Sequence, residues 1–390
     1  MKRINVLGNF SGRNAGDAAI LGCLLEDISS RYENVEFLIP TINSPFVKKE
    51  YAGYQVKPVS LLPWNFSVKI FGLPVFRSVM KSDMVLVTDA ILFDRKLYNP
   101  LFNYLWTLSL VLPQAKSRGI PVILYNCSLG PIHSKAGHRC LERILQSADK
   151  VILRDKESFE LLQAKQLSHP NIFAGADCAL NSKAVDEERL GQICDKEGIF
   201  KSGRAVFGFN VNSYVDAFIR QDGKPFGRSH LIDIYANSVD RVIDAHDAEV
   251  IFVETQHMDV KIAEQVLAAI KRRDRVKLIS NKRYGYRDIS AVLAKMDIFV
   301  GMRTHSLILS SAMGVPPVGI MTYPKNRGYM RTIGLEDHLV AFRDLSADSF
   351  FEKIDAVFRN RKAVKEKMIP LVHREKQKAS QAAGYLEEYL

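Results

Sequence analysis

The chain has 390 residues, of which 47% are hydrophobic and 25% are charged. At roughly 100–200 residues per domain, this length predicts two domains with a sizeable core each, and the mixed composition excludes a largely disordered chain. The formal net charge of +11 favours an anionic partner. Neither a zinc-finger spacing nor an RNP-like aromatic motif occurs, so we expect no nucleic-acid partner.

The five cysteines are widely spaced and contain no CxxC pair. This pattern favours thiols in a reducing compartment over disulfides or structural zinc, and we expect no metal site.

The N-terminal "MKRINVLGNF" resembles a first strand rather than a signal peptide, and no window reaches the roughly 18 apolar residues of a membrane span. We therefore expect a cytoplasmic protein. The aromatic and basic stretch 61–76 leaves peripheral contact with an anionic membrane open.

Apolar runs of strand length alternate with helical patterns, which predicts parallel α/β structure. In the first half, strands are expected at residues 4–7, 35–39, 84–87, 122–125, 151–153 and 172–173. After the first strand, Ile20, Leu24 and Ile28 fall on one face of a predicted helix. Residues 181–203 are highly charged and lack a strand pattern, so we interpret them as a linker.

A second alternating series follows the linker. Its strands are expected at residues 205–209, 250–253, 276–279, 298–300 and 317–320. Asp259 is expected to cap a helix, Ser346 another, and Pro370 to interrupt the terminal helices.

The two series predict two Rossmann-like domains that face each other across a cleft. The N-terminal domain would span residues 1–180 and the C-terminal domain residues 204–345, followed by helices over 346–390. Because open α/β sheets bind ligands beyond the carboxyl ends of their strands, the cleft is the expected site.

Three strand-to-helix turns of the first domain carry polar residues. In "GNFSGRNAGD" (8–17) the glycines stand four apart, unlike a dinucleotide fingerprint, and Asp17 either stabilises the helix start or faces the cleft. Local sequence alone favours the structural interpretation. In "LYNCSLGPIHS" (124–134), His133 would ordinarily be an exposed turn residue. Arg154, at the tip of its strand in "LRDKES" (153–158), is equally compatible with a surface pair and a functional group.

The second domain places cations after two neighbouring strands. Arg303 and His305 follow a strand that ends at Gly301, and Lys325 follows the next strand. Arginine and lysine bind carboxylates and phosphates, and histidine transfers protons near neutral pH. We therefore expect an anion site with proton-transfer capacity at this sheet edge.

Taken in order, these motifs resemble the polysaccharide pyruvyl transferase family. The matching residues are Asn14, Gly16 and Asp17; Ser128, Gly130 and Pro131; Arg154, Asp155 and Ser158; Asp177; Gly301, Arg303 and His305; Gly314 to Pro316; and Tyr323 with Lys325. The chain departs from the family pattern after the strand at residues 84–87, where Thr88, Asp89 and Ala90 replace a glycine-rich turn.

The resemblance implies a GT-B-like fold and transfer of pyruvyl from phosphoenolpyruvate, as a ketal, to a sugar of a polysaccharide or its precursor. The expected role is exopolysaccharide or other cell-surface biosynthesis, with phosphoenolpyruvate as co-substrate and no further cofactor. The acceptor would be a sugar or a lipid-linked oligosaccharide. A nucleotide-sugar-dependent glycosyltransferase or epimerase of the same architecture is the alternative.

Roles for individual residues follow from the resemblance and from the chemistry of the side chains. His305 and Asp17 are the expected catalytic groups. Phosphoenolpyruvate would bind to Arg154, Arg303, His305 and Lys325. The acceptor would bind to Asn14, Gly16, Asp89, Ser128 and His133.

Overall fold

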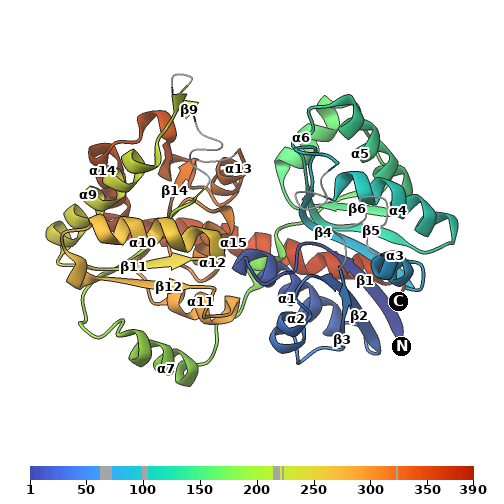
Figure 1. The fold of residues 1–390 in the computed structure, drawn as a ribbon, viewed down its shortest axis with the longest axis horizontal. Coiled ribbons are helices and arrows are strands. Elements are labelled where there is room, and N and C mark those ends of the chain that lie inside the picture. Colours follow the sequence, from blue (N-terminus) through green and yellow to red (C-terminus); the bar gives the residue numbers. More distant parts are fainter. Residues whose placement is uncertain (62–72, 99–103, 214–219, 222–223, 322–323) are drawn as a thin grey trace. The chain divides into compact units, whose positions relative to one another are not determined.

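The computed structural model describes residues 1–61, 73–98, 104–213, 220–221, 224–321 and 324–390. The described strands form two parallel sheets with helices between successive strands, plus one short antiparallel ribbon (Figure 1). The chain forms two compact units. Unit 1 comprises residues 1–12, 20–181 and 375–390, and unit 2 comprises residues 13–19 and 182–374.

The sheet of unit 1 has seven strands in the order β3-β2-β1-β4-β5-β6-β7. They are β1 (Lys2–Leu7), β2 (Val35–Thr41), β3 (Val56–Ser60), β4 (Met84–Leu92), β5 (Val122–Leu129), β6 (Lys150–Leu153) and β7 (Ile172–Ala174). All were predicted except β3, a half-exposed edge strand whose sequence VKPVS lacks an apolar run. The strand order reverses between β1 and β4, which makes their carboxyl ends the switch point of this sheet.

The helices that lie between β1 and β7 along the chain connect these strands. They are α1 (Ala15–Ser29), α2 (Ser44–Glu50), α3 (Leu73–Val79), α4 (Leu105–Ser117), α5 (Lys135–Ser147) and α6 (Lys156–Ala164). The predicted apolar face of α1 is buried throughout. Most of the 61–76 stretch lies outside the described residues, and no described helix is long and apolar enough to cross a bilayer.

The sheet of unit 2 has six strands in the order β12-β11-β8-β13-β14-β15. They are β8 (Val206–Phe209), β11 (Glu249–Glu254), β12 (Val276–Ser280), β13 (Ile298–Gly301), β14 (Pro317–Met321) and β15 (Leu339–Ala341), with β9 (Arg220–Gln221) and β10 (Lys224–Pro225) as the ribbon. The three-residue β15 was not predicted because it is too short to show a pattern. Buried Phe207, Phe209 and Phe252 from β8 and β11 lie in the core of this unit.

Unit 2 contributes most of the remaining helices. They are α7 (Glu187–Glu197), α9 (Arg228–His246), α10 (Val260–Ala269), α11 (Tyr286–Ala294), α12 (Thr304–Ala312), α13 (Pro324–Thr332), α14 (Ala347–Arg359) and α15 (Arg361–Gln381). Single 3₁₀ turns cover Cys178–Asn181, His257–Asp259, Arg273–Arg275, Glu336–His338, Phe342–Asp344 and Ala382–Leu386.

Three features differ from the sequence predictions. Residues 181–203, interpreted as a linker, contain α7 and group mainly with unit 2. The terminal helices over 346–390 belong to both units, because α15 begins in unit 2 and ends in unit 1. Pro370 does not interrupt α15; it lies on an exposed face, where water can bind the carbonyl that loses its helical partner. Ser346 caps α14 as predicted.

The chain ends close to where it starts. Lys2 Nζ donates to the backbone oxygen of Tyr389 at 3.2 Å, so both termini lie together in unit 1 (Figure 1). The five cysteines form no disulfide among the described residues, and four of them are buried.

Candidate functional site

A sharp strand-to-helix turn presents Arg303 and His305 at the carboxyl end of β13. A side chain on Gly301 would place its Cβ 2.8 Å from atoms of both Leu307 and Ser306, so glycine permits α12 to fold back directly after the strand. Buried Ser306 fits into this tight helix start because its hydroxyl donates to the carbonyl of Arg303 at 2.7 Å. The turn is therefore fixed at both ends.

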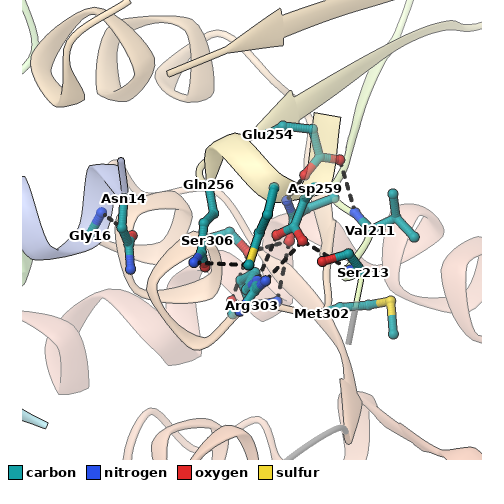
Figure 2. A network of polar contacts seen from close by, with 12 residues as sticks. Asn14, Gly16, Val211, Ser213, Glu254, Gln256, Asp259, Met302, Arg303 and Ser306 are labelled. Carbon is teal, nitrogen blue, oxygen red and sulfur yellow. Dashed lines mark hydrogen bonds and ion pairs between the residues drawn. The ribbon is translucent and has the colours of Figure 1, made fainter. Parts of the chain in front are cut away.

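The guanidinium of Arg303 forms a two-pronged ion pair with Asp259. Nε lies 2.7 Å from Oδ2 and Nη2 lies 2.8 Å from Oδ1, and the two side chains point toward one another in Figure 2. Asp259 is fully buried and also accepts from the backbone N–H of Ser213 at 2.9 Å.

The capping role predicted for Asp259 is wrong. Its backbone dihedral angles are already helical, and among the described residues its side chain makes no capping hydrogen bond. An effective cap needs an extended backbone to aim its oxygen at the first turn. The preceding 3₁₀ turn instead directs the carboxylate to Arg303.

Two further polar residues, Asn210 and Glu254, connect the backbone of Arg303 to the neighbouring strands. Asn210 Oδ1 accepts from the backbone N–H of Arg303 at 3.2 Å, while Asn210 Nδ2 donates to Glu254 Oε2 at 2.7 Å. Glu254 Oε1 accepts from the backbone N–H of Val211 at 3.1 Å (Figure 2). Burial, and then the neighbouring Asp259 carboxylate, raise the pKa of Glu254 well above its ordinary value.

His305 lies against the start of α1. Ala15 N–H donates to the carbonyl of Thr255 at 2.8 Å, and Asn14 bridges to Gln256, so residues 13–19 pack into unit 2. A Cβ on Gly16 would lie 2.2 Å from His305 Cγ, so only glycine leaves room for the imidazole ring here. The Asn-x-Gly-Asp and Gly-x-Arg-x-His motifs are thereby brought together.

Asn14 orients the neighbouring carboxylate. Its Oδ1 accepts from Gly16 N–H at 2.9 Å, and its Nδ2 donates to Asp17 Oδ1 at 2.7 Å. Asp17 Oδ1 lies 4.0 Å from His305 Nδ1. The sequence prediction assigns Asn14, Gly16 and Asp17 to the N-terminal domain, on the acceptor side. The structure groups them with unit 2, because this turn pairs with the loop after β11.

Asn326 connects the loops that follow β13 and β14. It is fully buried, its Nδ2 donates to the carbonyls of Met302 and Ile320 at 2.9 Å each, and its Oδ1 accepts from Thr304 Oγ1 at 2.5 Å. The half-buried Lys325 precedes it in the first turn of α13, at the same sheet edge as Arg303 and His305. Tyr323 lies outside the described residues.

Sequence reasoning missed Asn210, Glu254 and Asn326 as parts of this site. The first two stand where the apolar runs of β8 and β11 end, in "GFN" and "FVE". Asn326 directly follows Lys325. A polar residue at the end of a buried strand was the available signal in the first two cases.

Arg154 lies in unit 1, buried within a ring of carboxylates. Its Nη1 is 2.8 Å from Asp177 Oδ2 and 3.9 Å from Asp89 Oδ1. Burial opposes the charge of Arg154, but Asp177, Asp89 and Asp155 outweigh burial and raise the pKa of the guanidinium above its usual range. Anion binding by Arg154 would have to compete with these partners.

Asp89 itself adopts a left-handed backbone with φ of 69°, at a register shift between β4 and β5. Glycine adopts this conformation at lower cost, which explains physically why a glycine-rich turn suits the position. The departure at Thr88–Asp89–Ala90 thus adds a buried carboxylate beside Arg154, at a position with a left-handed backbone.

The other predicted residues of unit 1 have structural contacts. Asp155 caps α6 by accepting from Ser158 N–H at 2.9 Å, and Ser158 Oγ accepts from Leu129 N–H at 2.8 Å. Ser128 is fully buried, and the His133 side chain is exposed. Of the residues with predicted roles, the structure thus groups Arg154, Asp89, Ser128 and His133 in unit 1. It groups the others in unit 2: Asn14, Gly16, Asp17, Arg303, His305 and Lys325.

Comparison with known proteins identifies the family. The model of the polysaccharide pyruvyl transferase family matches residues 14–322, most of the chain, including Asp17, Arg303 and His305. This chain belongs to the polysaccharide pyruvyl transferase family. The amylovoran biosynthesis protein AmsJ of Erwinia amylovora is 22% identical to this chain over 419 aligned residues. The alignment covers 96% of each chain.

Solved structures confirm the predicted GT-B-like fold of this pyruvyl transferase family member. HepE of Anabaena, solved with UDP-glucose, has a TM-score of 0.63 at 14% identity and covers 100% of both chains. The UDP-GlcNAc 2-epimerase of Neisseria meningitidis, solved with UDP-GlcNAc, has a TM-score of 0.66 at 12% identity and covers 100% of this chain and 99% of its own. Identities this low establish the fold alone.

Proposed function

We propose that this protein transfers the pyruvyl group of phosphoenolpyruvate to two hydroxyls of one sugar in an exopolysaccharide or its precursor, forming a ketal. The carrying observation is the grouping of Arg303, His305, Asp17 and Lys325 at one sheet edge of unit 2. Phosphoenolpyruvate carries a carboxylate and a phosphate. A guanidinium, an ammonium and an imidazole suit that pair of anions.

In the proposed mechanism, His305 donates a proton to the methylene carbon of phosphoenolpyruvate. Positive charge then develops at the adjacent carbon that bears the phosphate. Arg303 and Lys325 hold the carboxylate and phosphate so that this carbon faces the acceptor. Holding both substrates in a reactive geometry can supply about 7–11 kcal/mol of the barrier reduction.

The acceptor reacts in two steps. One sugar hydroxyl forms a bond to the cationic carbon and gives its proton to Asp17. The carbon–oxygen bond to phosphate breaks, and the second hydroxyl closes the ketal ring. Over the whole cycle, one hydroxyl proton replaces the proton that His305 gave to carbon, and the other leaves with the phosphate.

The test is a transfer assay with phosphoenolpyruvate and exopolysaccharide repeat units, free or lipid-linked. Phosphate release and the proton NMR signal of the new ketal methyl group report the two products. His305→Ala is expected to lower turnover by about 10²–10⁴-fold, the usual contribution of a general acid. Unchanged turnover would remove His305 from this role.

Arginine variants separate binding from proton transfer. Arg303→Ala is expected to weaken phosphoenolpyruvate binding. Arg327→Ala is the matched control, because Arg327 is an exposed arginine of α13 that pairs with Glu336 at 2.6 Å. The control should leave binding and turnover unchanged.

The alternative function is nucleotide-sugar chemistry. HepE and the epimerase share the fold and are described with UDP-sugars. Binding of UDP-glucose or UDP-GlcNAc to this protein, without binding of phosphoenolpyruvate, would favour this alternative.

A further inference from the structure

We propose that Asp259 is a positioning residue that orients the Arg303 guanidinium toward a bound anion, and that Asn210 and Glu254 fix the backbone from which Arg303 projects. This inference rests on the proposed function, because the anion concerned is phosphoenolpyruvate. It assigns roles to three residues outside the family motifs described above.

The ion pair determines which edge of Arg303 a ligand can use. Asp259 occupies the edge formed by Nε and Nη2, at 2.7 and 2.8 Å. A carboxylate or phosphate would therefore accept from the end of the guanidinium, where the Nη1 and Nη2 groups lie side by side. A planar guanidinium can bind two anions in this way, and a lysine cannot.

Asp259 is unable to contact a ligand itself. Its side chain is 0% exposed, whereas that of Arg303 is 14% exposed. Its Oδ1 already accepts from Ser213 N–H and from Arg303 Nη2. Asp259 therefore acts on a bound anion through the groups that it holds, chiefly the Arg303 guanidinium.

The backbone of Arg303 is held from the neighbouring strands. Asn210, just after β8, accepts from Arg303 N–H at 3.2 Å and donates to the carbonyl of Val253 at 3.1 Å and to Glu254 at 2.7 Å. Because β8 lies between β11 and β13 in the sheet, this single side chain ties the ends of three adjacent strands together. Both ends of Arg303 are thus fixed before an anion arrives.

The central test is Asp259→Asn, with phosphoenolpyruvate binding measured by calorimetry on the full-length protein. The amide would direct N–H groups at the guanidinium, break the ion pair and release Arg303 from its orientation. We expect the affinity to fall roughly tenfold or more, as for other buried charge pairs that lose one partner. In an Arg303→Ala background the same substitution should have no further effect.

The chain offers a matched control for this substitution. Asp288 forms a similar two-pronged pair with Arg189, at 3.0 and 3.3 Å, elsewhere in unit 2. Asp288→Asn should leave phosphoenolpyruvate affinity within about twofold of the wild type, since Asp288 lies outside the network around Arg303. Thermal unfolding of each variant reports any purely structural effect.

Arg303→Lys is the second variant, for the case in which Asp259→Asn does not fold. Lysine keeps the charge but cannot pair with Asp259 and clamp an anion at once, so binding should weaken nearly as much as in Arg303→Ala. The Arg303 Nε–H resonance, assigned by its loss in Arg303→Lys, should shift in a folded Asp259→Asn protein.

Two results would overturn the inference and are distinguishable. If the wild type binds phosphoenolpyruvate and either Asp259→Asn or Arg303→Lys binds it equally well, the positioning role is wrong and the proposed function stands. If the wild type binds neither phosphoenolpyruvate nor inorganic phosphate, the proposed function fails and the positioning role fails with it.

Discussion

At the scale of single residues, Gly16 shows how a motif glycine serves a side chain distant in sequence. Its backbone lies so close to His305 that an added Cβ would meet three atoms of that residue at 2.2–2.4 Å. The sequence motif Asn-x-Gly-Asp suggested a ligand-binding turn. The structure indicates that its glycine makes room for the imidazole ring, while Asn14 and Asp17 lie at the edge of that space.

Gly16→Ala should therefore displace His305 and reduce activity. We expect turnover in the transfer assay to fall at least about tenfold, since misplacement of a reacting group by about 1 Å can cost 10²-fold. The control is Gly191→Ala in α7, where a Cβ meets no described atom within 4 Å. That variant should keep full activity and gain about 0.5–1 kcal/mol of stability. Equal activities of the two variants would refute the steric argument.

Glu254 gives a prediction for stability against pH. Its pKa is raised in the folded protein, so the native state holds its proton more tightly than the unfolded chain, whose value is near 4.5. As pH rises from about 4.5 through the raised native value, the native state becomes relatively less stable. The contribution of Glu254 to the free energy of unfolding is thus fully present below about pH 4.5 and decreases as the pH rises toward the raised native pKa.

Glu254→Gln removes this titration. Urea unfolding at several pH values should show the wild type losing free energy of unfolding relative to Glu254→Gln as pH increases above about 4.5. A difference between the two proteins that is constant with pH, or that grows in favour of the wild type, would contradict the assignment.

At the scale of secondary-structure elements, apolar runs and flanking polar turns predicted most of the strands. The exceptions are physical: β3 is a half-exposed edge strand, and β15 has only three residues. Arg303, His305 and Lys325 could be placed at one edge because neighbouring parallel strands end together. The pairing of Arg303 with Asp259 was not predictable, because a residue that precedes a helix looks like a cap in sequence.

Strand β4 provides a test of backbone strain. Asp89 has a φ of 69° and is 5% exposed. Asp89→Gly and Asp89→Ala both remove the carboxylate, so their difference isolates the backbone. We expect Asp89→Ala to be less stable than Asp89→Gly by about 1–2 kcal/mol in urea unfolding.

The neighbouring residue supplies the control for this comparison. Ala90 is outside the set of residues with positive φ, so Ala90→Gly should destabilise the protein through greater freedom of the unfolded chain. If the glycine variant is less stable than the alanine form at position 89 as well as at position 90, Asp89 does not carry the strain inferred from its φ.

At the scale of the whole molecule, the division into units does not follow the order of the sequence. Residues 13–19 group with unit 2, and residues 375–390 return to unit 1. Composition and strand patterns predicted two Rossmann-like domains but placed both segments by sequence position. That Asp17 belongs to the same unit as His305 was therefore beyond sequence reasoning, since it depends on which unit the first turn joins.

The returning segment is expected to be essential for unit 1. Asn126 Nδ2 donates to Ala379 at 3.0 Å, and Asn181 Nδ2 donates to Ser380 at 2.8 Å. Ending the chain at residue 374 would leave these buried or half-buried amides without those partners, so we expect a large drop in the unfolding temperature or loss of soluble protein. Ending it at residue 386, which removes mainly surface contacts, should have a small effect. Similar unfolding temperatures would contradict this role.

The central claim is that unit 2 binds phosphoenolpyruvate at the edge formed by Arg303 and His305. The most direct measurement is a crystal structure of the protein with phosphoenolpyruvate bound. Our account predicts the carboxylate or phosphate against the Nη1–Nη2 end of Arg303, with the methylene carbon beside His305. Phosphoenolpyruvate bound away from both residues, or a UDP-sugar occupying that edge while phosphoenolpyruvate does not bind, would contradict it.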